Sequence, residues 1–73
     1  MVHQFTAIIQ QEGDGYSALC PELDIASQGE TVESAQANLR EAVELFFECA
    51  PTEEVSRRLG KMRLVTQLEV TVG

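Results

Sequence analysis

The sequence is poor in positive charge. Five lysine and arginine side chains stand against twelve aspartates and glutamates, which gives a net charge of −7 and a pI of about 4.4. Nucleic acids and anionic membranes are polyanions, so a surplus of negative charge disfavours binding to either. We therefore expect no direct nucleic-acid contact and no membrane partner. A basic protein is the kind of partner that this charge favours.

Cysteine and histidine are also scarce. Cys20 and Cys49 permit at most one bridge, and the single histidine, His3, belongs to no metal-binding motif. This excludes a disulfide-rich scaffold and disfavours a structural zinc site. We expect no metal and no cofactor. The sequence leaves open whether the two thiols approach each other.

Long apolar runs are absent. No stretch approaches the roughly 20 apolar residues of a membrane helix, and the first residues carry no basic, apolar leader of the secretory type. We expect a cytoplasmic protein with reduced thiols.

The length of 73 residues predicts one domain that spans residues 1–73. A single core in so short a chain supplies about 3–5 kcal/mol, and such chains usually add disulfides, a metal or self-association. Because the first two are disfavoured here, we expect a homodimer or a larger homo-oligomer.

Three strands are predicted in the first part of the chain. Residues 2–12 and 15–20 are rich in strand formers, and the Asp14-Gly15 pair between them is typical of a tight hairpin turn. Pro21 should end the second strand, and residues 24–28 should form a short third one. Together they predict a three-stranded antiparallel meander.

One amphipathic helix is predicted over residues 32–49, with Thr31 as its N-cap. Seven residues fall on one apolar stripe at helical spacing: Val32, Ala35, Leu39, Ala42, Val43, Phe46 and Ala50. Acidic residues fall on the opposite face, among them Glu41, Glu44 and Glu48. Leu45 and Phe47 lie on the two shoulders of the stripe, where one sheet would leave them partly exposed.

The last part of the chain predicts a short helix and a long strand. Thr52 can cap a helix over 53–59 that Gly60 ends, and residues 62–72 alternate between apolar and polar side chains. If that strand lies at a sheet edge, it could pair with another chain. The predicted fold class is therefore α+β, with a three-stranded meander, one amphipathic helix and a C-terminal strand.

Four motifs in order resemble the HicB-like antitoxin family. They are Gly15-Tyr16 after the first turn, Pro21-Glu22-Leu23 at the end of the second strand, Gly29-Glu30-Thr31 before the helix, and the helix segment from Ala35 to Leu45. The resemblance covers about half of the chain. It implies a partly degraded RNase H-like fold of order β-β-β-α-β.

The resemblance also implies a function. Members of that family bind a small basic toxin that cleaves mRNA, mask its RNA-binding or active surface, and usually form oligomers. Many carry an additional DNA-binding domain, whereas the present sequence predicts a single HicB-like domain without one. We expect the signature residues Gly15, Tyr16, Pro21, Gly29 and Thr31 to act mainly on the fold.

The candidate partner-binding residues are Glu41, Glu44 and Glu48 with the apolar Leu45 and Phe47. A solvated acidic face is the simplest interpretation of the three carboxylates, and docking of a basic partner is the functional one. A metal-dependent RNase H-like nuclease would need further acids on the strands, so we expect no catalytic residues and no enzyme. The alternatives are a stand-alone homo-oligomer of another role and a divergent metal-dependent RNase H-like nuclease.

Other polar residues favour structural interpretations. We assign Asp14 to the first turn and His3 to the first strand, and we expect Asp24, after the Pro21-Glu22-Leu23 kink, to satisfy backbone amides there. Arg57, Arg58, Lys61 and Arg63 form the one basic cluster, which we interpret as a solvated segment that balances the acidic helix.

Overall fold

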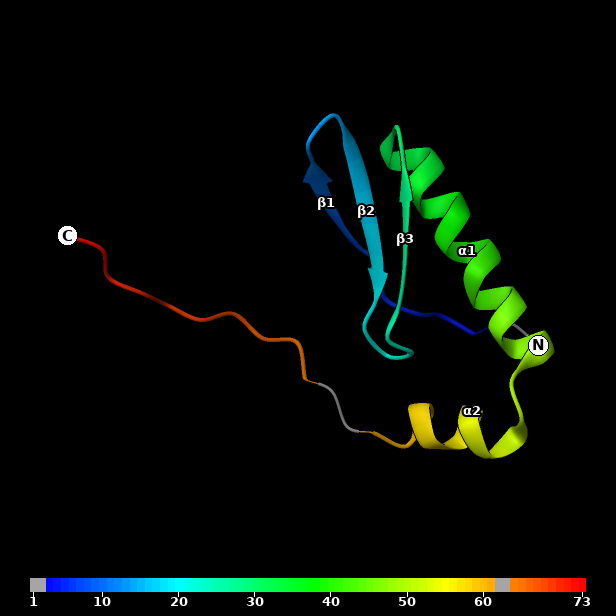
Figure 1. Cartoon of the computed structure of the whole chain (residues 1–73). Coiled ribbons are helices and arrows are strands. Elements are labelled where there is room, and N and C mark those ends of the chain that lie inside the picture. The colour runs from blue at the N-terminus through cyan, green and yellow to red at the C-terminus, as the bar shows by residue number, and fades with distance from the viewer. Residues whose placement is uncertain (1–2, 62–63) are drawn as a thin grey trace.

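A computed structural model describes residues 3–61 and 64–73 of the chain (Figure 1). Its elements are β1 (Ile8–Glu12), β2 (Gly15–Cys20), β3 (Ile25–Gly29), α1 (Val32–Cys49) and α2 (Thr52–Leu59). The three strands form one antiparallel sheet in the order β1-β2-β3, and α1 lies against it. The predicted α+β class and meander are confirmed.

The first turn differs from its prediction by one residue. Gly13 and Asp14 form the two-residue loop, and Gly13 has the positive φ of 55°. Gly15 is already the first residue of β2 and lies opposite Glu12. The prediction that the Asp14-Gly15 pair makes the turn is therefore wrong, because Gly13 supplies the left-handed backbone.

The second turn delays the third strand. Pro21 to Asp24 form the turn after β2, and Asp24 has a φ of 56°. A left-handed residue cannot continue a strand, so β3 begins at Ile25, one residue later than predicted.

β1 is shorter than the predicted strand over 2–12, of which Val2 lies outside the described residues. Residues 3–7 form no ladder with β2, because β2 ends at Cys20 and the turn follows. The backbone amide of Thr6 donates instead to the Glu22 carboxylate, with an N–Oε2 distance of 2.9 Å, and its hydroxyl donates to the same oxygen at 2.7 Å. The Glu22 side chain therefore fixes the segment before β1 through hydrogen bonds that a pairing strand would otherwise have made.

α1 has the predicted bounds and cap. The Ser34 amide donates to Thr31 Oγ1 at 3.0 Å, and the Thr31 amide donates to Ser34 Oγ at 3.0 Å, which is a reciprocal capping box. One turn further on, the Asn38 side-chain amide donates to the carbonyl oxygen of Gln28 in β3 at 2.7 Å. The helix is thus fixed to the sheet at its N-terminal half.

The core lies between α1 and the β2–β3 side of the sheet. Its buried apolar residues are Ala18, Cys20, Leu23, Ala35 and Leu39. α1 packs chiefly on β3 and β2 and only marginally on β1. The aromatic side chains are at most partly buried around this core, so the described part of the chain buries little apolar volume.

α2 starts one residue earlier than predicted. Thr52 is its first residue, Pro51 occupies the cap position, and no side chain caps the helix. The prediction of Thr52 as the N-cap is therefore wrong. Gly60 ends α2 as expected.

The predicted C-terminal strand is not formed. Met62 and Arg63 lie outside the described residues, and residues 64–73 form an extended, exposed segment that runs away from the sheet and helices (Figure 1). A strand exists only through hydrogen bonds to a neighbouring strand, and this segment has none within the described chain. The RNase H-like assignment includes that fourth strand and stays a prediction.

Within residues 3–61 and 64–73, no helix combines the length and the apolar character needed to cross a membrane.

Candidate protein-binding site

The outer face of α1 carries an acidic ridge, which we define as Glu41, Glu44 and Glu48. All three side chains are exposed, as are the flanking Leu45 (58 %) and Phe47 (39 %). Residues three and four apart on a helix are neighbours, so the three carboxylates form one continuous row. The structure thus brings the five predicted partner-binding residues together on one helix, with the apolar residues on either side of the ridge.

The ridge carboxylates form no ion pairs with the described residues. The two ion pairs found there, Arg57–Glu54 and Arg58–Glu54, both lie in α2. The last turn of α1 contains no basic residue. The ridge is therefore free of direct ion pairs among the described residues, and Arg40, four positions before Glu44 on the same helix, is the cation nearest to it along α1.

The position of the ridge is unfavourable for the helix itself. The C-terminal end of a helix carries a partial negative charge, and like charges four residues apart repel each other. Glu48 lies in the last turn of α1 and follows Glu44 by four residues, so Glu48 meets both conditions. Helix stability therefore gives no reason for a carboxylate at position 48, which favours a role of Glu48 in binding.

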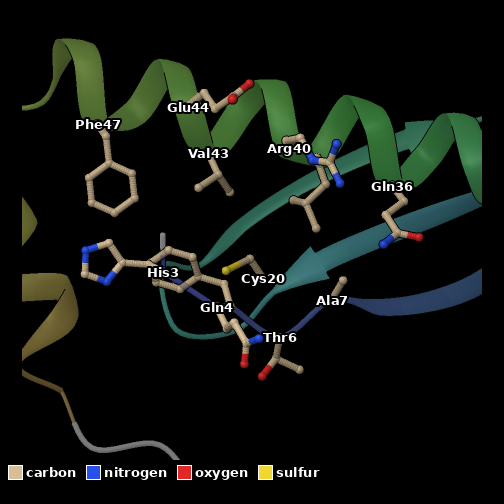
Figure 2. Close-up of a pocket in the computed structure, with 12 residues that line it drawn as sticks. His3, Gln4, Thr6, Ala7, Cys20, Gln36, Arg40, Val43, Glu44 and Phe47 are labelled. Atoms are coloured by element: carbon tan, nitrogen blue, oxygen red, sulfur yellow. The ribbon is translucent and has the colours of Figure 1, made fainter. Parts of the chain in front are cut away.

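Phe47 borders a groove of about 740 Å³ between α1 and residues 3–7 (Figure 2). Figure 2 shows His3, Gln4, Thr6 and Ala7 on one side and side chains of α1 on the other, with Cys20 between them. The rings of Phe5 and Phe47 lie 5.8 Å apart, centre to centre. Sequence reasoning missed this groove, because it arises where the helix leaves the β1 side of the sheet uncovered.

Leu45 borders a second, shallower hollow of about 520 Å³. Its lining includes Ile25, Ala42, Phe46 and Arg58. The two apolar residues beside the ridge therefore face different surroundings, Phe47 toward the N-terminal segment and Leu45 toward β3 and α2.

The signature glycines hold a close approach between the sheet and α1. A Cβ at Gly29 would overlap the Ala35 amide nitrogen and Ser34 Oγ, and a Cβ at Gly15 would come within 2.9 Å of the Gly29 carbonyl oxygen. Thr31 caps α1 directly after this contact.

The other two signature residues lie along β2. Tyr16 packs at the edge of the core, and Pro21 opens the turn after β2. Each of the five signature positions thus has a structural task.

Glu22 has a role that sequence reasoning missed. Partial desolvation opposes its ionisation, but hydrogen bonds from the Thr6 hydroxyl and from the Glu22 and Thr6 backbone amides outweigh it and lower the pKa of this carboxyl. The nearby Cys20 thiol donates to Glu22 Oε1 at 3.6 Å, and burial together with the Glu22 charge raises the pKa of that thiol. The Pro21-Glu22-Leu23 motif therefore anchors the segment before β1.

The basic cluster is solvated at Arg57 and Lys61, as predicted, but Arg58 is partly buried and makes contacts that the prediction missed. Arg57 and Arg58 pair with Glu54, and Arg58 also donates to the Leu23 carbonyl oxygen at 2.7 Å. The Arg58 guanidinium lies 4.8 Å from the centre of the Phe46 ring. The planar Arg58 guanidinium, which can donate several hydrogen bonds at once, thus connects α2 to the core. Lys61 is exposed, and Arg63 lies outside the described residues.

The remaining candidates lie apart from one another. Asp14 and Asp24 are turn residues. His3 is exposed, and the centres of its ring and the Phe5 ring lie 6.2 Å apart in a tilted arrangement. Cys20 is buried and Cys49 is exposed, and both are free thiols. In the part of the chain that the structure describes, no three His, Cys, Asp or Glu side chains come together as metal ligands.

Comparison with known proteins gives relatives in two bacteria. UPF0150 protein ssl0738 of Synechocystis sp. is 44% identical over 50 residues, which are 66% of this chain and 69% of the relative. UPF0150 protein ssr1258 of the same organism is 34% identical over 64 residues, which are 85% of this chain and 93% of the relative. A UPF0150 protein of Helicobacter pylori is 31% identical over 65 residues, which are 88% of this chain and 90% of the relative. In another relative, UPF0150 protein ssr1765 of Synechocystis sp., the match spans 62% of the relative's length.

No family model matches the chain. No solved structure matches it either. The relatives, matched along most of their length, nevertheless define its family: the chain belongs to the UPF0150 family.

Proposed function

We propose that this UPF0150 chain is a HicB-like, antitoxin-type binding module that neutralises a small basic mRNA-cleaving toxin. The acidic ridge of α1 would dock on the basic surface that holds RNA, and the toxin would then be unable to bind its substrate. This role belongs to a binding protein and not to an enzyme, and it places the chain in the cytoplasm, where mRNA is.

The observation that carries the proposal is the unpaired acidic ridge with an exposed apolar residue on each side. Complementary charge accelerates association and selects the partner, while apolar contacts contribute affinity. The acidic ridge provides the complementary charge. Leu45 and Phe47 provide the apolar contacts. The net charge of −7 adds a long-range attraction for any basic protein.

The ridge is also held rigidly. The capping box and the Asn38–Gln28 hydrogen bond fix the start of α1, and the contact of Arg58 with Phe46 braces its end. A preformed surface loses little conformational entropy on binding, which supports its use for docking.

The proposal predicts a gene for a short basic protein beside the gene of this chain, and the test is binding to that protein and rescue from its toxicity. Co-expression should restore growth that the basic protein alone stops, and calorimetry should give a 1:1 ratio of the two chains or a simple multiple. Absence of such a gene, or failure of the two purified proteins to bind, would overturn the proposal.

A pair of charge-matched variants tests the ridge. Glu41→Gln, Glu44→Gln and Glu48→Gln together should weaken binding roughly 10- to 100-fold, mostly through slower association. The control combines Glu12→Gln, Glu30→Gln and Glu53→Gln, which removes three exposed carboxylates elsewhere and has the same net charge. Equal losses in both variants would show that net charge acts without the ridge.

We also propose that the chain self-associates. Among the described residues the buried core comprises five apolar residues, the largest of them leucines, while ten large hydrophobic side chains are exposed. A core this small gives a marginal domain, and burial between copies would add to its stability.

A further inference from the structure

The C-terminal segment 64–73 has the pattern of a strand but pairs with no other strand among residues 3–61 and 64–73. Leu64, Leu68, Val70 and Val72 share one face with Thr66, and these four apolar side chains are 66–91 % exposed. The segment contains a single charged residue, Glu69, in a chain that is otherwise highly charged. Such a segment gains apolar burial and backbone hydrogen bonds only if it joins a sheet.

The edge that can receive this segment is that of β1. β1 is the first strand of the sheet, so its outer side carries no strand, and residues 3–12 contain no lysine or proline that would block pairing. The β3 edge is less available, because α1 packs chiefly on that side and Asn38 already donates to Gln28.

The groove lies on the same side as the free edge. Phe5, Ala7, Leu39, Val43 and Phe47 contribute apolar atoms to its wall (Figure 2). Phe5 and Ile9 pack toward the core, so the groove lies on the helix-facing side of the sheet. A strand added beside β1 would point every second side chain into it.

The lengths agree as well. Residues 64–73 and residues 3–12 are ten residues each, and both span about 33 Å when extended at about 3.3 Å per residue. The segment leaves the body after Gly60 and Lys61 and runs away from the sheet of its own chain (Figure 1).

We propose that residues 64–73 of one copy add as a fourth strand beside β1 of a second copy, with the exchange reciprocal. The face formed by Leu64, Leu68, Val70 and Val72 closes the groove of the partner. A two-fold exchange uses the same surfaces twice, so each copy gives one segment and receives one, and both β1 edges are covered. The exchange rests on the proposed self-association and is independent of toxin binding.

The first experiment measures mass by light scattering over a range of concentrations. The full chain should give twice its 8.0 kDa mass at micromolar concentration. Leu68→Asp with Val70→Asp should raise the dissociation constant roughly 100-fold or more, since two buried apolar side chains become charged. The control, Gln67→Asp with Thr71→Asp, adds the same charge on the other face and should stay dimeric.

The second experiment uses the unmodified chain and therefore does not depend on the folding of a variant. Equal amounts of 15N-labelled and 13C-labelled chain are mixed, and isotope-filtered NOEs are recorded. Contacts between the methyl groups of Leu68 or Val70 in one copy and Phe5, Val43 or Phe47 in the other are expected.

Three results would overturn the exchange. A monomer, with the segment free or folded on its own β1, would remove both the exchange and the self-association. A dimer in which those contacts arise within one chain would remove the exchange alone. A dimer that the Leu68→Asp and Val70→Asp pair leaves intact would do the same.

Discussion

Arg58 of α2 donates a hydrogen bond from Nη1 to the carbonyl oxygen of Leu23, 2.7 Å away and 35 positions earlier in the chain. The same guanidinium lies over the Phe46 ring, and its Nε donates a hydrogen bond to Glu54 Oε1 at 2.8 Å in an ion pair. One side chain thus connects α2, the end of α1 and the turn before β3.

Removal of this connection should destabilise the chain. Arg58→Ala should lower the free energy of unfolding by about 2 kcal/mol, since it deletes a charged hydrogen bond and a cation–π contact. Urea unfolding followed by circular dichroism measures the change. Arg57→Ala is the control, because the Arg57 guanidinium is exposed and pairs with Glu54 at the surface, so its loss should lower stability far less than the loss of Arg58. Equal effects of the two substitutions would contradict the bridging role of Arg58.

The close approach at Gly29 should tolerate no side chain. Gly29→Ala should lower the free energy of unfolding by about 3 kcal/mol, because the new Cβ meets backbone atoms of α1 that cannot move without shifting the helix. Thermal unfolding is the measurement. Gly73→Ala, where a Cβ meets no described atom within 4 Å, should leave the midpoint unchanged. A Gly29→Ala variant as stable as the parent chain would contradict the contact.

Acid should weaken the fold through Glu54 and Glu22. Hydrogen bonds from Arg57 and Arg58 lower the pKa of Glu54 from 4.5 to about 2, and the pKa of Glu22 is also lowered. A carboxyl whose pKa falls on folding stabilises the native state above its ordinary pKa, and that contribution is lost as the pH falls toward the folded value. Unfolding free energy should therefore decline as the pH falls from about 4.5 toward about 2.

The Glu54 carboxyl can be followed directly. Its carbon resonance should titrate near pH 2, and Glu54→Gln should reduce the acid dependence of unfolding. Glu53→Gln, an exposed neighbour on the same helix turn, serves as the control. Titration of Glu54 at its ordinary value would contradict the paired arrangement.

Stability and binding should change in opposite directions at Glu48. Glu48→Lys replaces a repulsive charge at the end of α1 with one that suits the helix dipole and can pair with Glu44 four residues earlier, so unfolding should cost about 0.5–1 kcal/mol more. Affinity for the basic partner should fall at the same time. Denaturation and calorimetry on one preparation measure both. A variant that gains stability and keeps its affinity would show that the ridge does not take part in docking.

The helical part of the fold follows closely from local pattern. The bounds of α1, its Thr31 cap and its exposed acidic ridge depend on residues within one or two turns, and the structure has all three where the sequence predicts them. β2 has its predicted bounds for the same reason.

Longer-range contacts escaped prediction. The Glu22 carboxylate accepts the hydrogen bond of the Thr6 amide, 16 positions away. Arg58 donates to the Leu23 carbonyl oxygen across 35 positions. Neither separation along the chain corresponds to a helix or strand period, so no sequence pattern indicates that these residues meet. The residues that line the groove beside Phe47 come from three separate segments.

Periodicity, caps and turn residues therefore specify where each helix and central strand forms, because these depend on neighbours along the chain. The ends of β1, the anchoring of α2 and the fate of residues 64–73 depend on which groups meet in space. An alternating segment becomes a strand only beside another strand, and residues 64–73 have none in the part of the chain that the structure describes. That is why the best-patterned strand of the sequence is extended and unpaired in the folded chain.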